Sequence, residues 1–328
     1  MLIETNEIHC VVCEKYSGLR LDIFLSQTID NTTRSRIKNL SQKGNIKIKQ
    51  NNEFVNFNSV SYIVKLGDEF IIDVNYSGME DIKPKYMDIE ILYEDEYLAV
   101  INKPAGLVVH PGAGNYENTL VNGLLEKYKD QLSKNNGSVR PGIVHRLDKD
   151  TSGVIVVAFN DETHVKLAKQ FEVHSITRHY RALVWGLLVP KSGNIHTHIK
   201  RSDFNRLKMA VSNKGKEAIT DYKTIQSYDR FLSLVDLKLH TGRTHQIRVH
   251  MAHKGNAIVG DSLYGSNINK YMNKLPSTIQ DSIKNITRQC LHAYKLGFIH
   301  PHTGKYLCIE QNEPEYLQKL YNDLFFTE

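Results

Sequence analysis

The chain has 328 residues, enough for about two domains of roughly 150 residues each. Apolar residues make up 41% of it and the formal net charge is +6, so the composition predicts a folded protein with an acidic partner and excludes a disordered tail. Four cysteines are too few for a disulfide scaffold. No apolar run suits a signal peptide or a membrane span, so we expect a cytoplasmic protein without a membrane partner.

The N-terminal part of the chain predicts a strand-like extension over residues 1–16, followed by two short helices and short strands. Apolar residues recur at helical spacing after Gly18, and Thr33 is placed to cap a second helix that ends at Gly44. Residues 17–49 carry seven Lys or Arg against two Asp or Glu, a local charge of +5. This pattern fits an RNA-binding surface and the solvated face of a structural module equally well. The basic residues of the second helix and its end are Arg34, Arg36, Lys38 and Lys43.

Residues 77–87 have the composition of a linker, and a longer series of strands and helices is expected beyond them. The apolar run 154–159, bounded by Gly153 and Asn160, is typical of a buried strand. The other expected elements are a hairpin over 89–102, a helix capped by Thr119, a helix after Asn160, a strand ending at Gly186, an irregular basic stretch over 199–216, a strand over 235–239, a helix after Gly242 capped by Thr244, a partly helical insertion over 266–289 and a C-terminal helix.

A polar segment, residues 140–153, leads into the buried strand and carries a candidate functional carboxylate. Asp148 stands beside Arg146 and Lys149, and nearby positive charge favours an ionised carboxylate. Residues 140–248 carry 19 Lys or Arg against 10 Asp or Glu, a charge of +9 that suits a polyanionic substrate. For a single Asp, a surface loop with ordinary ion pairs is the alternative.

Several motifs together resemble one enzyme family. His-Arg-Leu-Asp at 145–148, followed by Thr-Ser-Gly at 151–153, resembles the signature of the RluA-type RNA pseudouridine synthases. Residues 241–250 resemble the third motif of that family, and residues 291–293 and 300–301 resemble its C-terminal pattern. The resemblance extends over roughly residues 17–310, so it implies the family for nearly the whole chain.

The resemblance implies roles for five residues. Asp148 is expected to be the catalytic residue, with Arg248 paired to it and Tyr180 as the active-site tyrosine. Arg146 is expected to fill the space that a flipped-out base leaves, and His145 to contribute to RNA binding. Considered singly, Arg248 would also fit a surface ion pair and Tyr180 a position in the core.

The resemblance also implies a fold. We expect an α/β (α+β) catalytic domain over 88–328 with a mixed, largely antiparallel central sheet. Residues 17–76 resemble an S4 RNA-binding module, which implies that the basic second helix binds RNA; residues 77–87 are then the linker. The residues that carry this second resemblance are Arg20-Leu21-Asp22, Ser35-Arg36, Gly44 and Gly67-Asp68.

The implied reaction turns uridine into pseudouridine, which oxidises nothing and releases nothing, so no cofactor is expected. Whether Asp148 attacks C1′ as a nucleophile or removes a proton at C2′ is open. Residues 103–112 and 119–122 most resemble the branch of the family that modifies helix 69 of 23S rRNA, which implies a monomeric enzyme acting on the precursor of the large ribosomal subunit. The alternatives are other rRNA or tRNA uridines, a non-catalytic RNA-binding or assembly protein, and a base hydrolase.

No metal site is expected. Cys10 and Cys13 form a lone C-x-x-C pair without a second pair at zinc-finger spacing. His250 and His253 stand three residues apart, near two further histidines, but no carboxylate motif accompanies them.

Overall fold

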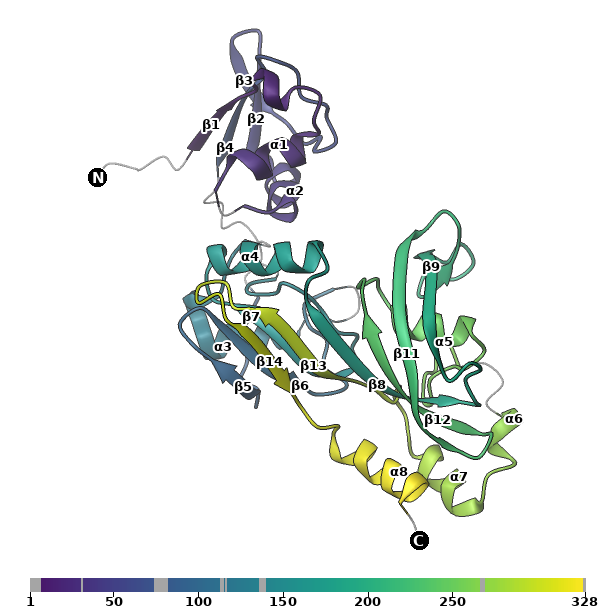
Figure 1. Cartoon of the computed structure of the whole chain (residues 1–328). Coiled ribbons are helices and arrows are strands. Elements are labelled where there is room, and N and C mark those ends of the chain that lie inside the picture. The colour runs from purple at the N-terminus through teal and green to yellow at the C-terminus, as the bar shows by residue number, and fades with distance from the viewer. Residues whose placement is uncertain are drawn as a thin grey trace.

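The chain forms a small N-terminal domain and a larger domain (Figure 1). None of the described helices is long and apolar enough to cross a bilayer. This computed structural model describes residues 7–30, 32–73, 82–112, 115, 117–135, 140–265 and 269–326.

The small domain packs two helices on a four-stranded sheet of order β1-β4-β2-β3. As expected, Thr33 caps the second helix, because its side chain accepts a hydrogen bond from the N–H of Arg36. Leu21, Phe24 and Ile37 of the helices are fully buried in the core. The elements are β1 (Glu7–Val11), the 3₁₀ helix η1 (Glu14–Tyr16), α1 (Leu21–Thr28), α2 (Arg34–Gln42), β2 (Ile46–Gln50), β3 (Glu53–Asn56) and β4 (Glu69–Asp73).

The N-terminal strand belongs to this sheet. β1 pairs antiparallel with β4 from Glu7 opposite Asp73 to Val11 opposite Glu69. Its alternate residues Ile8 and Cys10 pack against the core. Within the separate extension expected over residues 1–16, residues 7–11 are therefore an edge strand of the small domain, and residues 14–16 form η1.

The structure describes only part of the segment that we expected to be a linker. Residues 77–81 lie outside the described residues, and residues 82–87 pack on the larger domain. The N–H of Lys85 donates to the carbonyl of Asn122 (3.0 Å), and the Asn122 amide donates to the carbonyl of Lys83 (2.8 Å). Met87 also packs against the apolar cluster around the helix that contains Asn122.

The larger domain is built on a ten-stranded sheet of order β10-β9-β11-β12-β8-β13-β7-β6-β5, with β14 paired to β13. All pairings are antiparallel except that between β7 and β13, so the mixed, largely antiparallel sheet is confirmed. The strands are β5 (Glu90–Glu94), β6 (Leu98–Lys103), β7 (Ser152–Ala158), β8 (Thr177–Trp185), β9 (Ser192–Arg201), β10 (Met209–Val211), β11 (Lys216–Tyr228), β12 (Leu232–Leu239), β13 (Leu291–Ile299) and β14 (Tyr306–Glu310).

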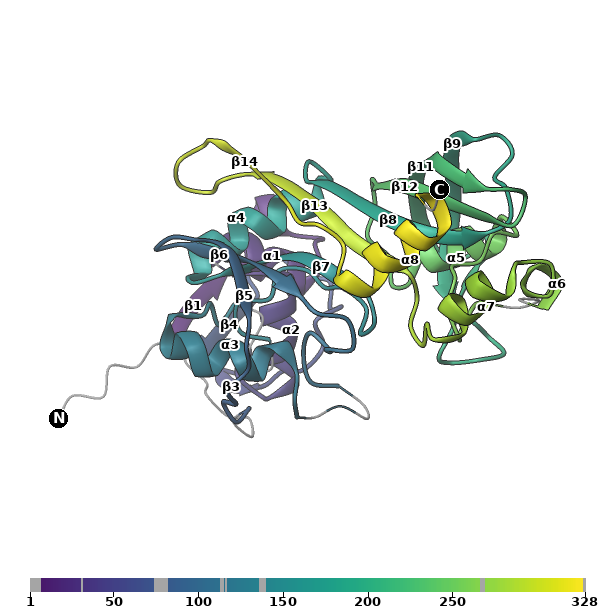
Figure 2. The same ribbon diagram turned by 90° about the horizontal axis from the view of Figure 1, so that it is seen from below.

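β13 joins the two halves of this sheet, because it lies between β8 and β7. Figure 2 shows β13 and β14 extending between the half that contains β5 to β7 and the half that contains β9, β11 and β12. All seven residues of β7 are buried, as the apolar run predicts. Gly153 lies directly against the backbone of Ala293, where an added Cβ would come within 2.2 Å of a carbonyl oxygen.

The helices cover parts of the sheet and contact the small domain. α4 lies between the small domain and the sheet (Figure 1). Its Asp161 forms a 2.6 Å ion pair with Arg36 of α2, and the N–H of Thr33 donates to Asn135 (3.0 Å). The helices are α3 (Leu120–Tyr128), the 3₁₀ helix η2 (Lys129–Gln131), α4 (Asp161–Glu172), α5 (Gln246–His253), α6 (Asn269–Met272), α7 (Ser277–Lys284) and α8 (Glu315–Phe325).

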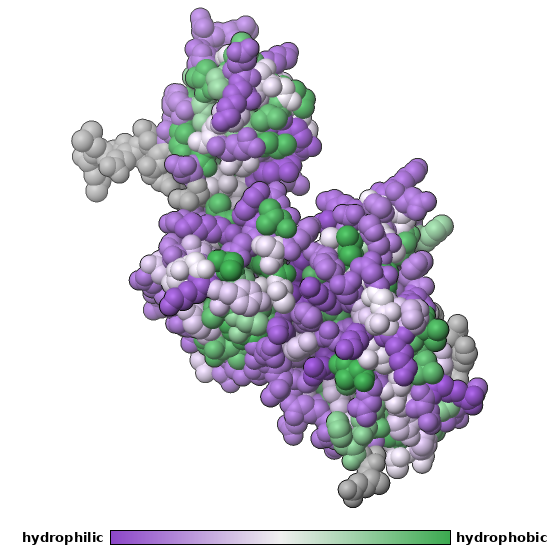
Figure 3. Space-filling model, viewed as in Figure 1, coloured by the Kyte–Doolittle hydropathy of each residue, from purple (hydrophilic) through white to green (hydrophobic). Residues whose placement is uncertain are grey.

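The stretch 199–216, expected to be irregular, is largely a β-hairpin. Residues 209–211 of β10 pair antiparallel with residues 199–201 of β9. Ile199 is buried, whereas the neighbouring basic side chains lie outward. The many charged residues therefore made a regular strand look irregular in the sequence. Figure 3 shows that hydrophilic residues cover most of the viewed face of the molecule, with apolar residues in small separate groups.

Candidate active site

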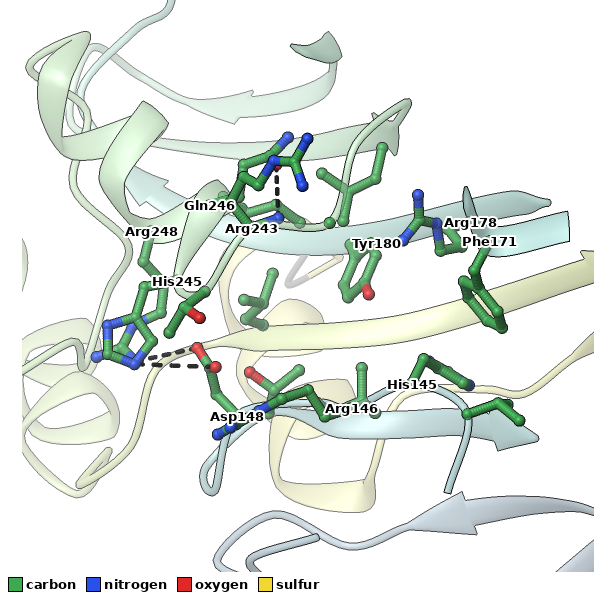
Figure 4. A pocket seen from close by; sticks show the side chains of 18 residues that line it. His145, Arg146, Asp148, Phe171, Arg178, Tyr180, Arg243, His245, Gln246 and Arg248 are labelled. Atoms are coloured by element: carbon green, nitrogen blue, oxygen red, sulfur yellow. Dashed lines mark hydrogen bonds and ion pairs between the residues drawn. The ribbon is translucent and has the colours of Figure 1, made fainter. Parts of the chain in front are cut away.

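Three segments far apart in the sequence line one pocket of about 260 Å³. Asp148 comes from the loop before β7, Tyr180 from β8 and Arg248 from α5. Figure 4 shows their side chains around a common space. Because β7 and β8 both pair with β13, the loop that enters β7 lies beside β8. The structure thus brings together the three residues expected to act together.

A chain of buried charges fixes the candidate carboxylate. Nη1 of Arg248 donates to Oδ2 of Asp148 (3.1 Å). Nε and Nη2 of Arg248 donate to the two carboxylate oxygens of Asp261, at 2.7 and 2.9 Å. Burial disfavours the charged guanidinium, but its bonds to Asp261 and the charge of Asp148 outweigh burial and hold the pKa of Arg248 above its ordinary value. Arg248 is therefore a permanent cation between two carboxylates and not a surface ion pair.

Asp261 is a site residue that sequence reasoning missed. Its side chain is fully buried and also accepts the N–H groups of Leu263 (3.0 Å) and Tyr264 (3.1 Å). It follows the buried run 257–259 and Gly260, so it stands at the end of an apolar segment much as Asp148 stands at the start of one. That pattern is the only local signal that could have drawn attention to it.

The turn before α5 is organised by Gln246, and Thr244 is not the N-cap that we expected. The N-cap is His245, in a left-handed conformation with φ of 56°. The side-chain carbonyl of Gln246 accepts the N–H of Arg243 (2.9 Å) and the hydroxyl of Thr241 (2.8 Å), which closes the turn from within the helix.

The left-handed turn directs His245 toward the site. Its Nε2 lies 3.9 Å from Oδ1 of Asp148, and its Nδ1 shares a 2.8 Å hydrogen bond with the hydroxyl of Tyr264. Burial lowers the pKa of His245, and the negative charge of Asp148 opposes that shift. His245 therefore gives Asp148 a second polar neighbour beside Arg248.

Tyr180 forms part of the pocket wall on β8. It is buried, and burial is the main cause that raises its pKa to about 12, with the charge of Asp148 adding to the shift. The phenol is therefore protonated at neutral pH, and its ring offers an apolar surface inside the pocket.

Lys103, at the end of β6, holds the loop of Asp148 by hydrogen bonds to backbone carbonyls. Its side chain is fully buried, and its ammonium donates to the carbonyls of Pro104 (2.8 Å), Leu107 (2.9 Å) and Lys149 (3.0 Å). Burial lowers its pKa to about 7, against the attraction of Asp150 and Asp148. The bond to Lys149 fixes the backbone next to Asp148.

The two residues expected to bind RNA beside Asp148 differ in position. Arg146 lines the pocket and is exposed, as a contact to a ligand requires. The ring of His145 stacks on Phe171 at 4.6 Å, and its Nε2 accepts the N–H of Val156 (3.0 Å). Burial lowers the pKa of His145 to about 3, so the ring is neutral and holds the loop onto β7.

The four basic residues expected to bind RNA on the second helix lie in the small domain, away from the residues that line the pocket. Arg34 pairs with Asp22 (2.8 Å), and Arg36 with Asp161. Lys38 is exposed and Lys43 is half-buried. Among the described residues, no group of three or more His, Cys, Asp or Glu could hold a metal ion.

The pocket suits chemistry by a single carboxylate on a nucleotide. Asp148 retains 16% side-chain exposure, whereas Asp261 has none, so only Asp148 is open to a ligand. A carboxylate held by Arg248 can attack an electrophilic carbon or accept a proton. The aromatic and basic wall residues are those that bind bases and phosphates. They are Arg146, Arg178, Tyr180 and Arg243.

Comparison with known proteins identifies the family of this chain. Residues 97–253 match the model of the family described as RNA pseudouridylate synthase. The chain is 42% identical to the ribosomal large subunit pseudouridine synthase D of Zymomonas mobilis, over 96% of each protein. It is 38% identical to an uncharacterized RNA pseudouridine synthase of Bacillus subtilis, over 97% of this chain and 98% of that protein.

A solved structure supports the fold. The human protein named RNA pseudouridylate synthase domain containing 4 matches with a TM-score of 0.56 and 25% identity, over 72% of this chain and 92% of that one. The family resemblance found in the sequence is thus confirmed over nearly the whole chain. This chain belongs to the RNA pseudouridylate synthase family, and it is an RNA pseudouridine synthase, an isomerase that acts on uridine.

Proposed function

We propose that this enzyme isomerises uridines of 23S rRNA in the stem-loop of helix 69, with Asp148 as its catalytic carboxylate. The observation that carries the catalytic assignment is the pairing of Asp148 with Arg248, which Asp261 holds in turn. The choice of RNA is supported by relatives named ribosomal large subunit pseudouridine synthase D, at 42% and 38% identity. It is further supported by residues 103–112 and 119–122, which resemble the branch that acts on helix 69.

The reaction requires that the N1–C1′ bond breaks, that the uracil turns, and that C5 joins C1′. C5 then gives up its proton and N1 gains one, so the product is an isomer of uridine. The target base must first leave its stack, which costs about a few kcal/mol. Arg146, exposed at the rim, fills the space that the base vacates. Asp148 then acts on the ribose, either as a nucleophile at C1′ or as a base at C2′.

Tyr180 stacks on the extruded uracil. Its pKa of about 12 keeps the phenol protonated, so at neutral pH it contributes as a stacking surface and hydrogen-bond donor and not as a phenolate base. Arg248 keeps the carboxylate of Asp148 in one orientation, and Nε2 of His245 lies 3.9 Å from the other carboxylate oxygen.

The small domain serves as an RNA-binding module of the S4 type in this proposal. Its α2 presents Lys38 to solvent one turn after Arg34, which is more than half exposed despite its ion pair with Asp22, and Lys43 caps the end of the helix half-buried. Arg36 is committed to Asp161 in the structure, so its contribution to RNA binding requires that this pair opens or that the phosphate joins it. Exposed cations on one helix face are the electrostatic footprint that RNA binding requires.

The test is a map of pseudouridine in 23S rRNA, 16S rRNA and tRNA from cells with and without this protein. We expect pseudouridine in helix 69 to disappear with the protein and to return with the wild-type chain. It should not return with Asp148→Asn, which keeps the shape of the side chain and removes its charge. Loss of pseudouridine elsewhere would overturn the choice of RNA, and restoration by a sequence-verified Asp148→Asn chain would overturn the role of Asp148.

A further inference from the structure

Arg178 is a buried cation that the mechanism above does not use. It lies near the start of β8, two residues before Tyr180, so both side chains lie on the same face of the strand. Only 8% of Arg178 is exposed, yet it lines the pocket that contains Asp148. Figure 4 shows Arg178 beside Tyr180 and Phe171, on the other side of Tyr180 from Asp148.

The guanidinium of Arg178 is incompletely bonded. Its Nη2 donates to the carbonyl of His240 over a long 3.3 Å, and its buried Nε has no hydrogen-bond partner within the described part of the chain. The ring of Phe171 lies 5.6 Å from its central carbon. Gly242 leaves the space that the group occupies, because an added Cβ there would lie 2.6 Å from Nη1.

No carboxylate of the described residues forms an ion pair with Arg178, in contrast to two other arginines of the same domain. Arg248 is held by two carboxylates, and Arg181, on the opposite face of β8, pairs with the buried Glu313 at 2.7 Å. The charge near Arg178 is instead positive. Burial and the neighbouring Arg243, opposed by Tyr180, lower the pKa of Arg178 from its ordinary value. Burying a cation without an anion costs free energy, so the binding of an anionic ligand beside Arg178 is favourable.

We infer that Arg178, assisted by Arg243, forms a binding subsite for a phosphodiester of the RNA strand next to the flipped-out uridine. Arg243 also lines the pocket and has one nitrogen engaged, with Nε donating to the carbonyl of Glu217, which leaves the rest of its fork for a ligand. RNA carries a phosphate on each side of every ribose, whereas the carbonyl groups of uracil are neutral and would leave the positive cluster without a counter-charge. The inference rests on the proposed action of Asp148 on a uridine bound in this pocket.

The test pairs a chemical change in the RNA with a change in the enzyme. The RNA is a synthetic stem-loop around a uridine that the wild-type enzyme converts, with one methylphosphonate, which is uncharged, either 5′ or 3′ of that uridine. For the wild type, neutralising one of the two linkages should weaken binding about tenfold to a hundredfold, the range for a hydrogen bond to a charged group. Arg178→Met should show that loss with the unmodified RNA and no further loss with the methylphosphonate.

Arg178→Lys and Arg230→Met complete the set. Arg178→Lys keeps the charge without the planar fork and should recover part of the affinity. Arg230 is an exposed residue of the turn between β11 and β12, outside the pocket, so Arg230→Met should remain as sensitive to the methylphosphonate as the wild type. The slope of log affinity against log salt should also fall by about 0.7 in Arg178→Met, as for one lost phosphate contact in a single strand.

The outcomes separate the possibilities. The inference is wrong if neither methylphosphonate weakens binding by the wild type. It is also wrong if the methylphosphonate weakens binding by Arg178→Met as much as it weakens binding by the wild type, because Arg178 then contacts no phosphate. A rate loss in Arg178→Met with unchanged sensitivity to the methylphosphonate would assign Arg178 to the uracil edge instead. Because the stem-loop contains a uridine already shown to be converted, a wrong choice of helix 69 would show in the pseudouridine map and not here.

Discussion

Replacing Asp261 by Asn should reduce both stability and activity, although Asp261 does not line the pocket. Among the described residues, Oδ2 of Asp261 accepts a hydrogen bond from Nε of Arg248 alone, whereas Oδ1 accepts hydrogen bonds from Nη2 of Arg248 and from the N–H groups of Leu263 and Tyr264. An Asn amide can keep the three bonds of Oδ1, but its NH₂ group then faces the donor Nε. Breaking a buried pair in this way costs about 3–5 kcal/mol. For a domain of this size, that corresponds to a loss of roughly 6–20 °C in Tm.

The effect on activity follows from the geometry of Arg248. With Asn at position 261, Arg248 keeps its 3.1 Å bond to Asp148 and the bond from Nη2 to Oδ1. It loses the bond from Nε, and with it the two-point contact that fixes its guanidinium plane. A misplacement of about 1 Å at such a site can cost about a hundredfold in rate. We therefore expect the single-turnover rate to fall by about that factor while RNA affinity stays close to that of the wild type, because Asp261 is fully buried and does not line the pocket.

The assay is denaturant unfolding and single-turnover isomerisation of wild type, Asp261→Asn and a control, Glu310→Gln. Glu310 forms an exposed ion pair with Lys295 on β13, and exposed pairs contribute less than about 1 kcal/mol. The reasoning is refuted if Asp261→Asn unfolds at the midpoint of the control and turns over at the wild-type rate. In that case Asp261 does not position Arg248.

The remaining predictions concern charge, pH and salt. The single-turnover rate should fall in the order wild type, Arg248→Lys, Arg248→Ala, because lysine keeps the positive charge beside Asp148 but loses the planar fork; equal rates in all three proteins would contradict this pairing. Burial holds the pKa of His145 at about 3, below its value of about 6.5 in an unfolded chain, so its contribution to stability is full above about pH 6.5 and is lost as the pH falls toward 3. His145→Gln should therefore lose less unfolding free energy than wild type between about pH 7 and about pH 4, and equal losses would argue against a buried neutral ring. Lys38→Ala should reduce the slope of log RNA affinity against log salt concentration by about 0.7 to 0.9, as for one lost phosphate contact. Lys305→Ala, at another exposed lysine, is the control, and an unchanged slope in Lys38→Ala would mean that this face of α2 is only solvated.

The features that could be predicted from the sequence depend on residues that are neighbours in the chain. Residues 145–148 identify the candidate catalytic loop because four neighbouring side chains carry the resemblance. The cap at Thr33 and the strand over 154–159 depend on nearby residues and could be predicted for the same reason.

What the sequence could not predict depends on partners distant in the chain. Asp261 is buried because Arg248 lies beside it in space, and an isolated Asp in a turn gives no sign of that. His245 adopts a left-handed conformation because the side chain of Gln246 closes the turn, so the rule that favours Thr at an N-cap did not apply. β1 joins the small domain by pairing with β4, about sixty residues further along the chain, and alternation alone does not choose a partner.

The place of β13 in the sheet determines when the candidate active site can form during synthesis. Tyr180 lies on one neighbour of this strand and Asp148 at the start of the other, and the parallel pairing of His292 with Ser152 spans 140 residues. Contacts of such long range form late, and a chain emerging during synthesis folds its N-terminal parts first. A nascent chain that ends before Leu291 therefore carries Asp148, Tyr180 and Arg248 but has no strand to join the halves that present them. The candidate active site is completed only once β13 has been translated.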